Sequence, residues 1–173
     1  MSPIPHPAPH EYAPFYASYI EKVPEGDLPS LLEAQVGDLE TLLANLDETT
    51  ALHRYAPGKW SIKEMLGHLA DAERVLVYRL LRIARGDATP LAGYEEDDYV
   101  RAAGFDRRTL PSLLAEFRAV RQGTMYLVRN LEPEAFARQG TANSRPFSAA
   151  ALAHILFGHV AHHMVVLRER YLA

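Results

Sequence analysis

The 173-residue sequence contains no cysteine, which excludes disulfide bonds, thiolate metal ligands and a cysteine nucleophile. If the protein carries out sulfur chemistry, the thiol must therefore come from another molecule. The formal net charge is only −4, and the chain lacks a run of basic residues that could track a phosphate backbone. We therefore expect no binding to nucleic acid.

Long apolar runs are also missing. No stretch approaches the roughly 18 uninterrupted apolar residues that a membrane span needs, and the first ten residues do not have the charged and apolar regions of a signal peptide. We therefore expect a cytoplasmic protein that does not bind membranes.

The composition is that of a globular protein, with 48% hydrophobic and 23% charged residues. A chain of this length fits one domain that can bury a core. Several prolines precede residue 15, so residues 1–14 are predicted to form an extended, proline-rich arm. Residues 15–173 are predicted to form a single four-helix-bundle domain that binds metal.

Four segments show the apolar spacing of amphipathic helices, whereas strand signals are weak. Capping boxes favour helix starts at Ser30, with Glu33, and at Ser61, with Glu64. The predicted helices run from about Ser30 to Leu46, Ser61 to Ala84, Thr109 to Leu131 and Ser148 to Tyr171. The fold class is therefore predicted as all-α, a four-helix bundle with long loops between helices two and three and between helices three and four.

The first long loop, residues 86–108, contains the acidic run from Glu95 to Asp98. Calcium loops space their ligands at alternate positions around a glycine, which this run does not do, so a solvated acidic loop is the favoured interpretation. A loop of this length can also cover a site as a lid. The second long loop, residues 134–147, has turn signals at Gly140 and at Asn143-Ser144.

The last helix carries histidines on its apolar stripe. At 100° per residue, His159 and His163 lie within the stripe, His162 lies at its edge and His154 lies outside it. Two imidazoles at positions i and i+4 can bind one metal ion. The alternative is that both are core histidines that bond to hydroxyls or carbonyls.

The second helix offers a third histidine, His68, within a polar stripe beside the apolar face. The stripe also contains Glu64, Asp71 and Arg79. It is either a solvated helix edge with Glu/Arg pairs or the wall of a cavity into which His68 points. This helix alone does not decide between the two interpretations.

These residues resemble the DinB superfamily, including its YfiT-like metalloenzymes and the related transferases that depend on low-molecular-weight thiols. The matching motifs are K-W-S-I-K-E-M-L-G-H-L-A-D-A-E-R (59–74), P-L-A-G-Y-E-E-D-D-Y-V (90–100) and G-H-V-A-H-H-M-V-V-L-R-E-R-Y (158–171). The resemblance implies a four-helix bundle, frequently a homodimer, that binds zinc or nickel through His68, His159 and His163. His162 is the rival ligand. Val160 occupies a position where the family often has an acidic residue.

Three neutral imidazoles leave coordination positions open, as in catalytic metal sites. The predicted function is a divalent-metal-dependent enzyme that transfers a low-molecular-weight thiol to an electrophile or hydrolyses a small substrate. Asp71 or Glu64 would handle protons, and Arg79 would receive an anionic substrate group. The alternatives are a non-catalytic, stress-related binding module that keeps the bundle, and a helical interaction protein in which the three histidines lie apart.

Overall fold

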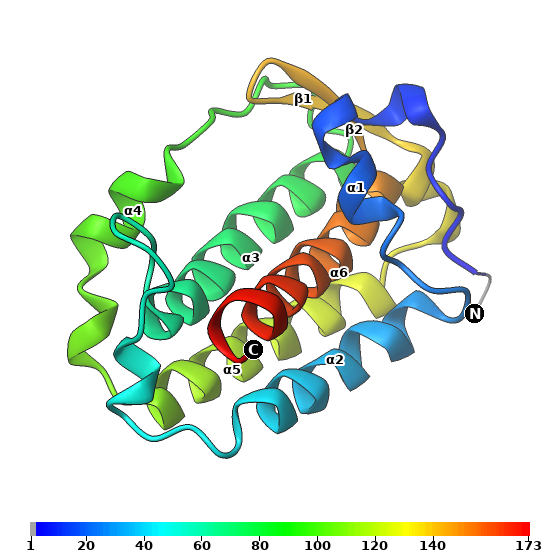
Figure 1. Ribbon diagram of the computed structural model, residues 1–173. Helices are drawn as coiled ribbons and strands as arrows, with labels where there is room; N and C mark the ends of the chain where they lie inside the picture. Colours follow the sequence, from blue (N-terminus) through cyan, green and yellow to red (C-terminus); the bar gives the residue numbers. More distant parts are fainter. Residues whose placement is uncertain (1–2) are drawn as a thin grey trace.

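The computed structural model describes residues 3–173 and confirms an all-α bundle (Figure 1). Two short helices and a two-stranded antiparallel hairpin accompany the four long helices. The long helices are α2 (Leu28–Leu43), α3 (Ile62–Ala84), α5 (Leu110–Arg129) and α6 (Ala149–Val166), and the short elements are α1 (Ala17–Ile20), α4 (Glu96–Ala103), β1 (Gln139–Ala142) and β2 (Arg145–Ser148). A wider π-helical turn, Leu167–Tyr171, follows α6.

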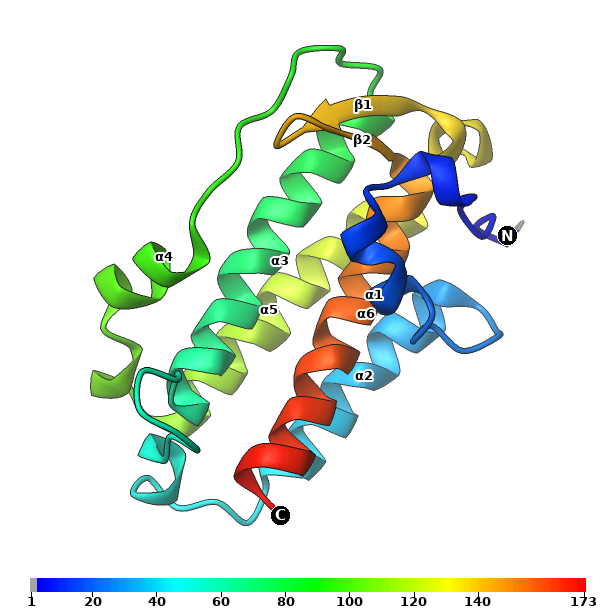
Figure 2. The same cartoon turned by 45° about the horizontal axis from the view of Figure 1, so that its top comes forward.

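The long helices do not follow one another around the bundle in sequence order. Helices α2 and α3 each pack against both α5 and α6, so α2 and α3 lie diagonally opposite although they are consecutive in the chain (Figures 1 and 2). Helix α1 packs against α6. Helix α6 therefore packs against α1, α2 and α3.

The predicted helix starts are confirmed for three of the long helices. The Ser61–Glu64 capping box begins α3, and the side chains of Thr109 and Ser148 cap α5 and α6. The prediction for α2 is wrong, because Asp27 is its cap and accepts hydrogen bonds from both the N–H and the hydroxyl of Ser30. An aspartate cap followed by proline in the first turn is a normal helix start.

Both long connections contain more structure than predicted. The acidic run is not a loop, because Glu96, Asp97 and Asp98 form the first turn of α4, where carboxylates interact favourably with the helix dipole. The second connection contains the β1–β2 hairpin. Its turn residues Asn143 and Ser144 have positive φ values of 49° and 57°. Tight two-residue hairpin loops of type I′ require positive φ at both central residues.

Helix α6 is buried on more sides than a single apolar stripe predicts. His154, predicted to lie outside the stripe, is only 5% exposed, and its Nδ1 lies 2.9 Å from the carbonyl oxygen of Ala150. The segment Ala149–Tyr171 is long and apolar enough to cross a membrane, but 67% of its most apolar stretch is buried inside the protein. Such burial is typical of a core helix.

The N-terminal segment packs against the bundle. Tyr12 and Ala13 are buried, and the ring of His6 lies 5.3 Å from that of His154. Residues 1 and 2 of the predicted arm lie outside the described residues.

Short 3₁₀ turns occur at Pro9–Glu11, Pro14–Tyr16, Thr50–Leu52, Phe105–Arg107 and Pro133–Ala137.

A buried polar network joins the four long helices. Arg121 of α5, 1% exposed, donates through Nε and Nη2 to the two carboxylate oxygens of Glu73 on α3, at 2.6 and 2.7 Å. Its Nη1 donates to Gln35 of α2, and its Nη2 also donates to the carbonyl oxygen of Leu156 on α6. The network fixes the relative positions of the helices at one level of the bundle.

Gly158 allows α1 to lie against α6. A Cβ atom at this position would be 2.1 Å from the carbonyl oxygen of Tyr19, so Gly158→Ala must displace α1. We expect the variant to lose about 1–3 kcal/mol of unfolding free energy, measured by urea denaturation. Gly37→Ala is the control, because nothing lies within 4 Å of its Cβ, and alanine there should stabilise the exposed helix by up to about 1 kcal/mol. Equal stability of the two variants would contradict this prediction.

Candidate metal centre

Three histidines from two helices converge in the bundle. The Nε2 atom of His159 lies 3.0 Å from Nε2 of His68 and 3.1 Å from Nε2 of His163. One ring nitrogen from each residue lies within 4.8 Å of the others. The hypothesis of a helical interaction protein predicts that the three histidines lie apart, so this arrangement contradicts it.

The helices explain why these side chains meet. His159 and His163 are one turn apart on α6, so they project from the same side of it. His68 projects from α3, which packs directly against α6. Helix α6 can approach α1 closely because Gly158, the residue before His159, has no side chain to meet the backbone of Tyr19.

Burial keeps the three imidazoles neutral. Desolvation lowers the pKa of His68 to about 4 and that of His163 to about 3. The pKa of His159 is also lowered well below its usual value by desolvation, with further lowering from His163 and His68. Neutral imidazole is the form that binds a metal ion, so all three side chains are available as ligands at neutral pH.

The crowding of the three Nε2 atoms fits a cation better than it fits hydrogen bonds. A neutral imidazole nitrogen either donates or accepts, so Nε2 of His159 cannot form two full hydrogen bonds with its two neighbours. Tetrahedral ligands bound about 2.0–2.1 Å from zinc lie about 3.3 Å apart, close to the two observed separations. The three residues therefore fit a divalent metal ion.

The surroundings of the cluster include residues that the sequence did not point to. The ring of Trp60 lies 4.6 Å from that of His68, and its indole N–H donates to Asp97 Oδ1 at 2.9 Å. The ring of Tyr19 lies 5.6 Å from that of His159, and burial raises the pKa of Tyr19 to about 12. Trp60 and Asp97 lie within the matching motifs but were not predicted as part of the site, and Tyr19 lies outside those motifs.

The cluster has access to solvent on the His163 side. A cavity of about 310 Å³ is lined by His163, His162, Trp60, Asp97 and Met65, among others. His162, the rival ligand, lines this cavity but does not belong to the group of converging nitrogens. Its ring lies 5.2 Å from that of Tyr19. Val160, at the position where the family often has an acidic residue, is buried.

The other predicted site residues lie along α3 and have partners of their own. Glu64 accepts from the backbone N–H of Ser61 and pairs with Arg54, so it belongs to the helix cap. Asp71 pairs with Arg74, and its pKa is raised, mainly by desolvation. Arg79 donates to the carbonyl oxygen of Ala92. Within residues 3–173, none of the three is hydrogen-bonded to the histidine cluster.

Solved structures that resemble this fold include the following two. YfiT from Bacillus subtilis, described as a probable metal-dependent hydrolase with an unusual four-helix bundle topology, aligns with a TM-score of 0.75 at 17% identity, over 82% of each chain. The mycothiol-dependent maleylpyruvate isomerase aligns with a TM-score of 0.67 at 16% identity, over 84% of this chain and 61% of its own length. At these identities the similarity shows the fold alone.

A search of curated proteins found no sequence that matches this chain. The family model of the DinB superfamily matches residues 31–167. This range contains all four long helices except the first residues of α2, and it includes the three clustered histidines. The chain belongs to the DinB superfamily.

Proposed function

We propose that this protein is a divalent-metal-dependent enzyme in which His68, His159 and His163 hold the ion, zinc or nickel. Its reaction is the transfer of a low-molecular-weight thiol to an electrophilic substrate or the hydrolysis of a small substrate. The observation that carries the proposal is the convergence of three neutral imidazole nitrogens beside a cavity.

The ligand set supports a catalytic site over a structural one. Structural zinc sites are closed by four protein ligands, whereas catalytic sites use three and leave a position open. Only these three histidines form a candidate metal group among the described residues, and His163 lines a cavity. When bound, a divalent ion supplies Lewis acidity and lowers the pKa of a coordinated water or thiol.

The protein's own residues would then orient the substrate and move protons. Trp60 and Tyr19 flank the cluster with aromatic surface, which restricts water near His68 and His159. Asp71 is the better of the two predicted proton-handling residues, because its pKa is raised while Glu64 is engaged in the helix cap. A carboxyl group with a raised pKa can donate and accept a proton closer to neutral pH.

The thiol branch of the proposal is compatible with the composition. The chain has no cysteine, so any sulfur nucleophile must be external. The name of one structural neighbour includes dependence on mycothiol, which supports this branch for the present chain. The hydrolase branch is supported by the description of YfiT. In either branch we propose a cytoplasmic homodimer that acts on a small molecule.

The competing proposal is a non-catalytic, stress-related binding module that retains the metal. It would require a metal position sealed from solvent. The cavity beside His163 favours the enzyme.

Metal analysis of the native chain tests the ligand assignment. We expect protein purified without an affinity tag to contain about one divalent ion per chain, measured by inductively coupled plasma mass spectrometry. Dialysis against a chelator should remove the ion, and zinc or nickel should restore it. A chain that neither contains nor takes up a divalent ion would contradict the proposal.

A substrate screen then separates the enzyme from the binding module. The metal-loaded protein is incubated with small thiols and electrophiles, and separately with esters and amides, and the products are followed by mass spectrometry. Turnover that disappears on chelation and returns with the metal would support the enzyme. Metal binding without turnover of either substrate class would favour the binding module.

A further inference from the structure

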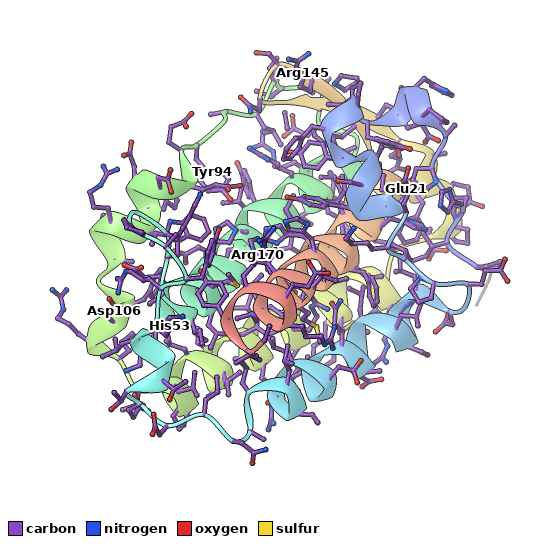
Figure 3. The ribbon with its side chains drawn as sticks, viewed as in Figure 1. Glu21, His53, Tyr94, Asp106, Arg145 and Arg170 are labelled. Carbon is purple, nitrogen blue, oxygen red and sulfur yellow. The ribbon has the colours of Figure 1, made fainter. Side chains whose placement is uncertain are left out.

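A second cavity lies along α3, away from the histidine cluster. Its volume is about 470 Å³, and it is lined by Arg79 from α3 and by Leu91, Ala92 and Tyr94 from the segment that precedes α4. This segment runs beside α3 from the hairpin towards α4 in both ribbon views (Figures 1 and 2). Tyr94 lies where the segment approaches α4 (Figure 3).

Arg79 is a buried cation that has no carboxylate partner within residues 3–173. The residue is 4% exposed, and its one hydrogen bond in that range runs from Nη2 to the carbonyl oxygen of Ala92, at 2.9 Å. None of the ion pairs among the described residues includes it, whereas the other buried arginine, Arg121, is paired with both oxygens of Glu73. A buried charge without a counter-ion is unfavourable. Arg79 is therefore suited to bind an anionic ligand.

The acidic groups near this cavity do not pair with Arg79. Burial raises the pKa of Tyr94, Glu96 raises it further and Arg79 lowers it, but Glu96 does not line the cavity and forms no ion pair with Arg79 among the described residues. Arg74 and Arg82 also line the cavity, and each already has an acidic partner, Asp71 and Asp87 respectively. Tyr94, whose ring centroid lies 5.9 Å from the Arg79 guanidinium carbon, has a pKa raised mainly by desolvation and is neutral at pH 7. Of the three arginines that line the cavity, Arg79 alone has no acidic partner among the described residues.

The walls indicate which kind of anion fits. Leu91 and Tyr94 provide apolar surface inside the cavity, and two exposed aromatic residues, Tyr78 and Tyr99, also line it. A guanidinium binds a carboxylate through two parallel N–H donors and stacks on aromatic rings. A carboxylate that is attached to an apolar or aromatic body would use both parts of the site, whereas inorganic phosphate would leave the apolar walls unused.

We propose that this cavity binds the carboxylate group of a small organic acid, with Arg79 as its counter-ion and with Tyr94 and Leu91 against its apolar body. Arg79 follows His68 by eleven residues on the same helix, which is three turns plus about 20° and a rise of about 16 Å. The two residues therefore lie on one face of α3. If the proposed metal-dependent function holds, the acid is the distal end of the enzyme's substrate, and this extension rests on that function.

Substitution of Arg79 should leave the cavity wall in place. The backbone N–H of Leu91 donates to Thr141, and that of Asn143 donates to Leu91, each at 2.9 Å. The hairpin thus holds the segment independently of Arg79. Arg79→Gln removes the charge, and Arg79→Lys keeps it without the two-donor geometry. Arg82→Gln is the matched control, because it removes a charge that lines the same cavity but is already paired.

Binding of phenylacetate and of inorganic phosphate to the full chain tests the proposal. Calorimetry would give the affinities, and ¹⁵N NMR would follow the backbone amides of Ala92 and Gly93. We expect phenylacetate to bind at one site and to shift these amides, with at least about tenfold weaker binding in Arg79→Gln. We expect an intermediate loss in Arg79→Lys and little change in Arg82→Gln. Phosphate should bind more weakly than phenylacetate.

Three results with the wild-type protein and the Arg79 and Arg82 variants would overturn the proposal. They are no binding of phenylacetate to the wild-type protein, tighter binding of phosphate than of phenylacetate, and an equal loss of affinity in Arg79→Gln and Arg82→Gln. The same titration in His159→Ala separates this proposal from the metal-centre proposal, because His159 does not line the cavity. Unchanged affinity in that variant would support the assignment to Arg79, and lost affinity would contradict it. Failure of phenylacetate to bind would leave the metal analysis unaffected.

Discussion

His159→Ala is expected to abolish tight divalent-metal binding and all metal-dependent turnover. His159 is the central member of the cluster, since its Nε2 is the atom near both other ring nitrogens. Loss of an outer partner of a metal ligand already weakens metal binding by about 10–100-fold, so loss of the ligand itself should exceed that range. Calorimetric titration of the chelated protein with zinc measures the effect.

The matched control is His162→Ala. This histidine lies three residues further along the same helix and is half-buried, but it is outside the converging group. We expect its metal affinity to stay within about threefold of the wild-type value, since it contributes no bond to the ion. Circular dichroism would establish that both variants keep their helix content. An equal loss in both variants would contradict the exclusion of His162 from the metal ligands.

The parts of the fold that could be predicted are those specified by local sequence. Helical periodicity and the side chains of Ser61, Thr109 and Ser148 identify three helix starts, because a cap is made within one turn of the chain. The diagonal placement of α2 and α3 was not predicted. It depends on contacts between helices that no sequence window contains.

The candidate metal site was predictable to a similar degree. The pair His159 and His163 follows from helical spacing. The second helix offered His68 as a third histidine, and the resemblance to the DinB superfamily implied that it is the third ligand. The aromatic residues beside the cluster, Trp60 and Tyr19, were not predictable. They reach the site from a connection and from α1, whose positions follow from packing against α3 and α6 and not from any local pattern.

The buried pair Glu73 and Arg121 was also not predicted. The sequence of each helix alone does not show whether the charged residue on it is buried or faces solvent. Only the packing of α3 against α5 shows that both are buried, at 2% and 1% exposure. The pair bears on function as well as stability, because Arg121 donates to the carbonyl oxygen of Leu156, one turn before His159 on α6.

Arg121→Met should be among the most destabilising single substitutions in this protein. It leaves the Glu73 carboxylate buried with only the hydroxyl of Thr124 as a donor among the described residues. Breaking a buried pair by removing one partner costs about 3–5 kcal/mol, so we expect a loss of that size in unfolding free energy by urea denaturation. Arg118→Met, which removes an exposed pair with Glu40, should cost less than about 1 kcal/mol.

The double variant Arg121→Met/Glu73→Leu separates loss of the pair from exposure of an unpaired charge. Apolar replacement of both partners is often neutral or stabilising, so the double variant should regain most of the stability that Arg121→Met loses. Its metal affinity should nevertheless stay below that of the wild type, because Leu156 of α6 has lost the donor that fixes it relative to α3 and α5. Recovery of stability together with full metal affinity would show that the network stabilises the bundle without positioning His159.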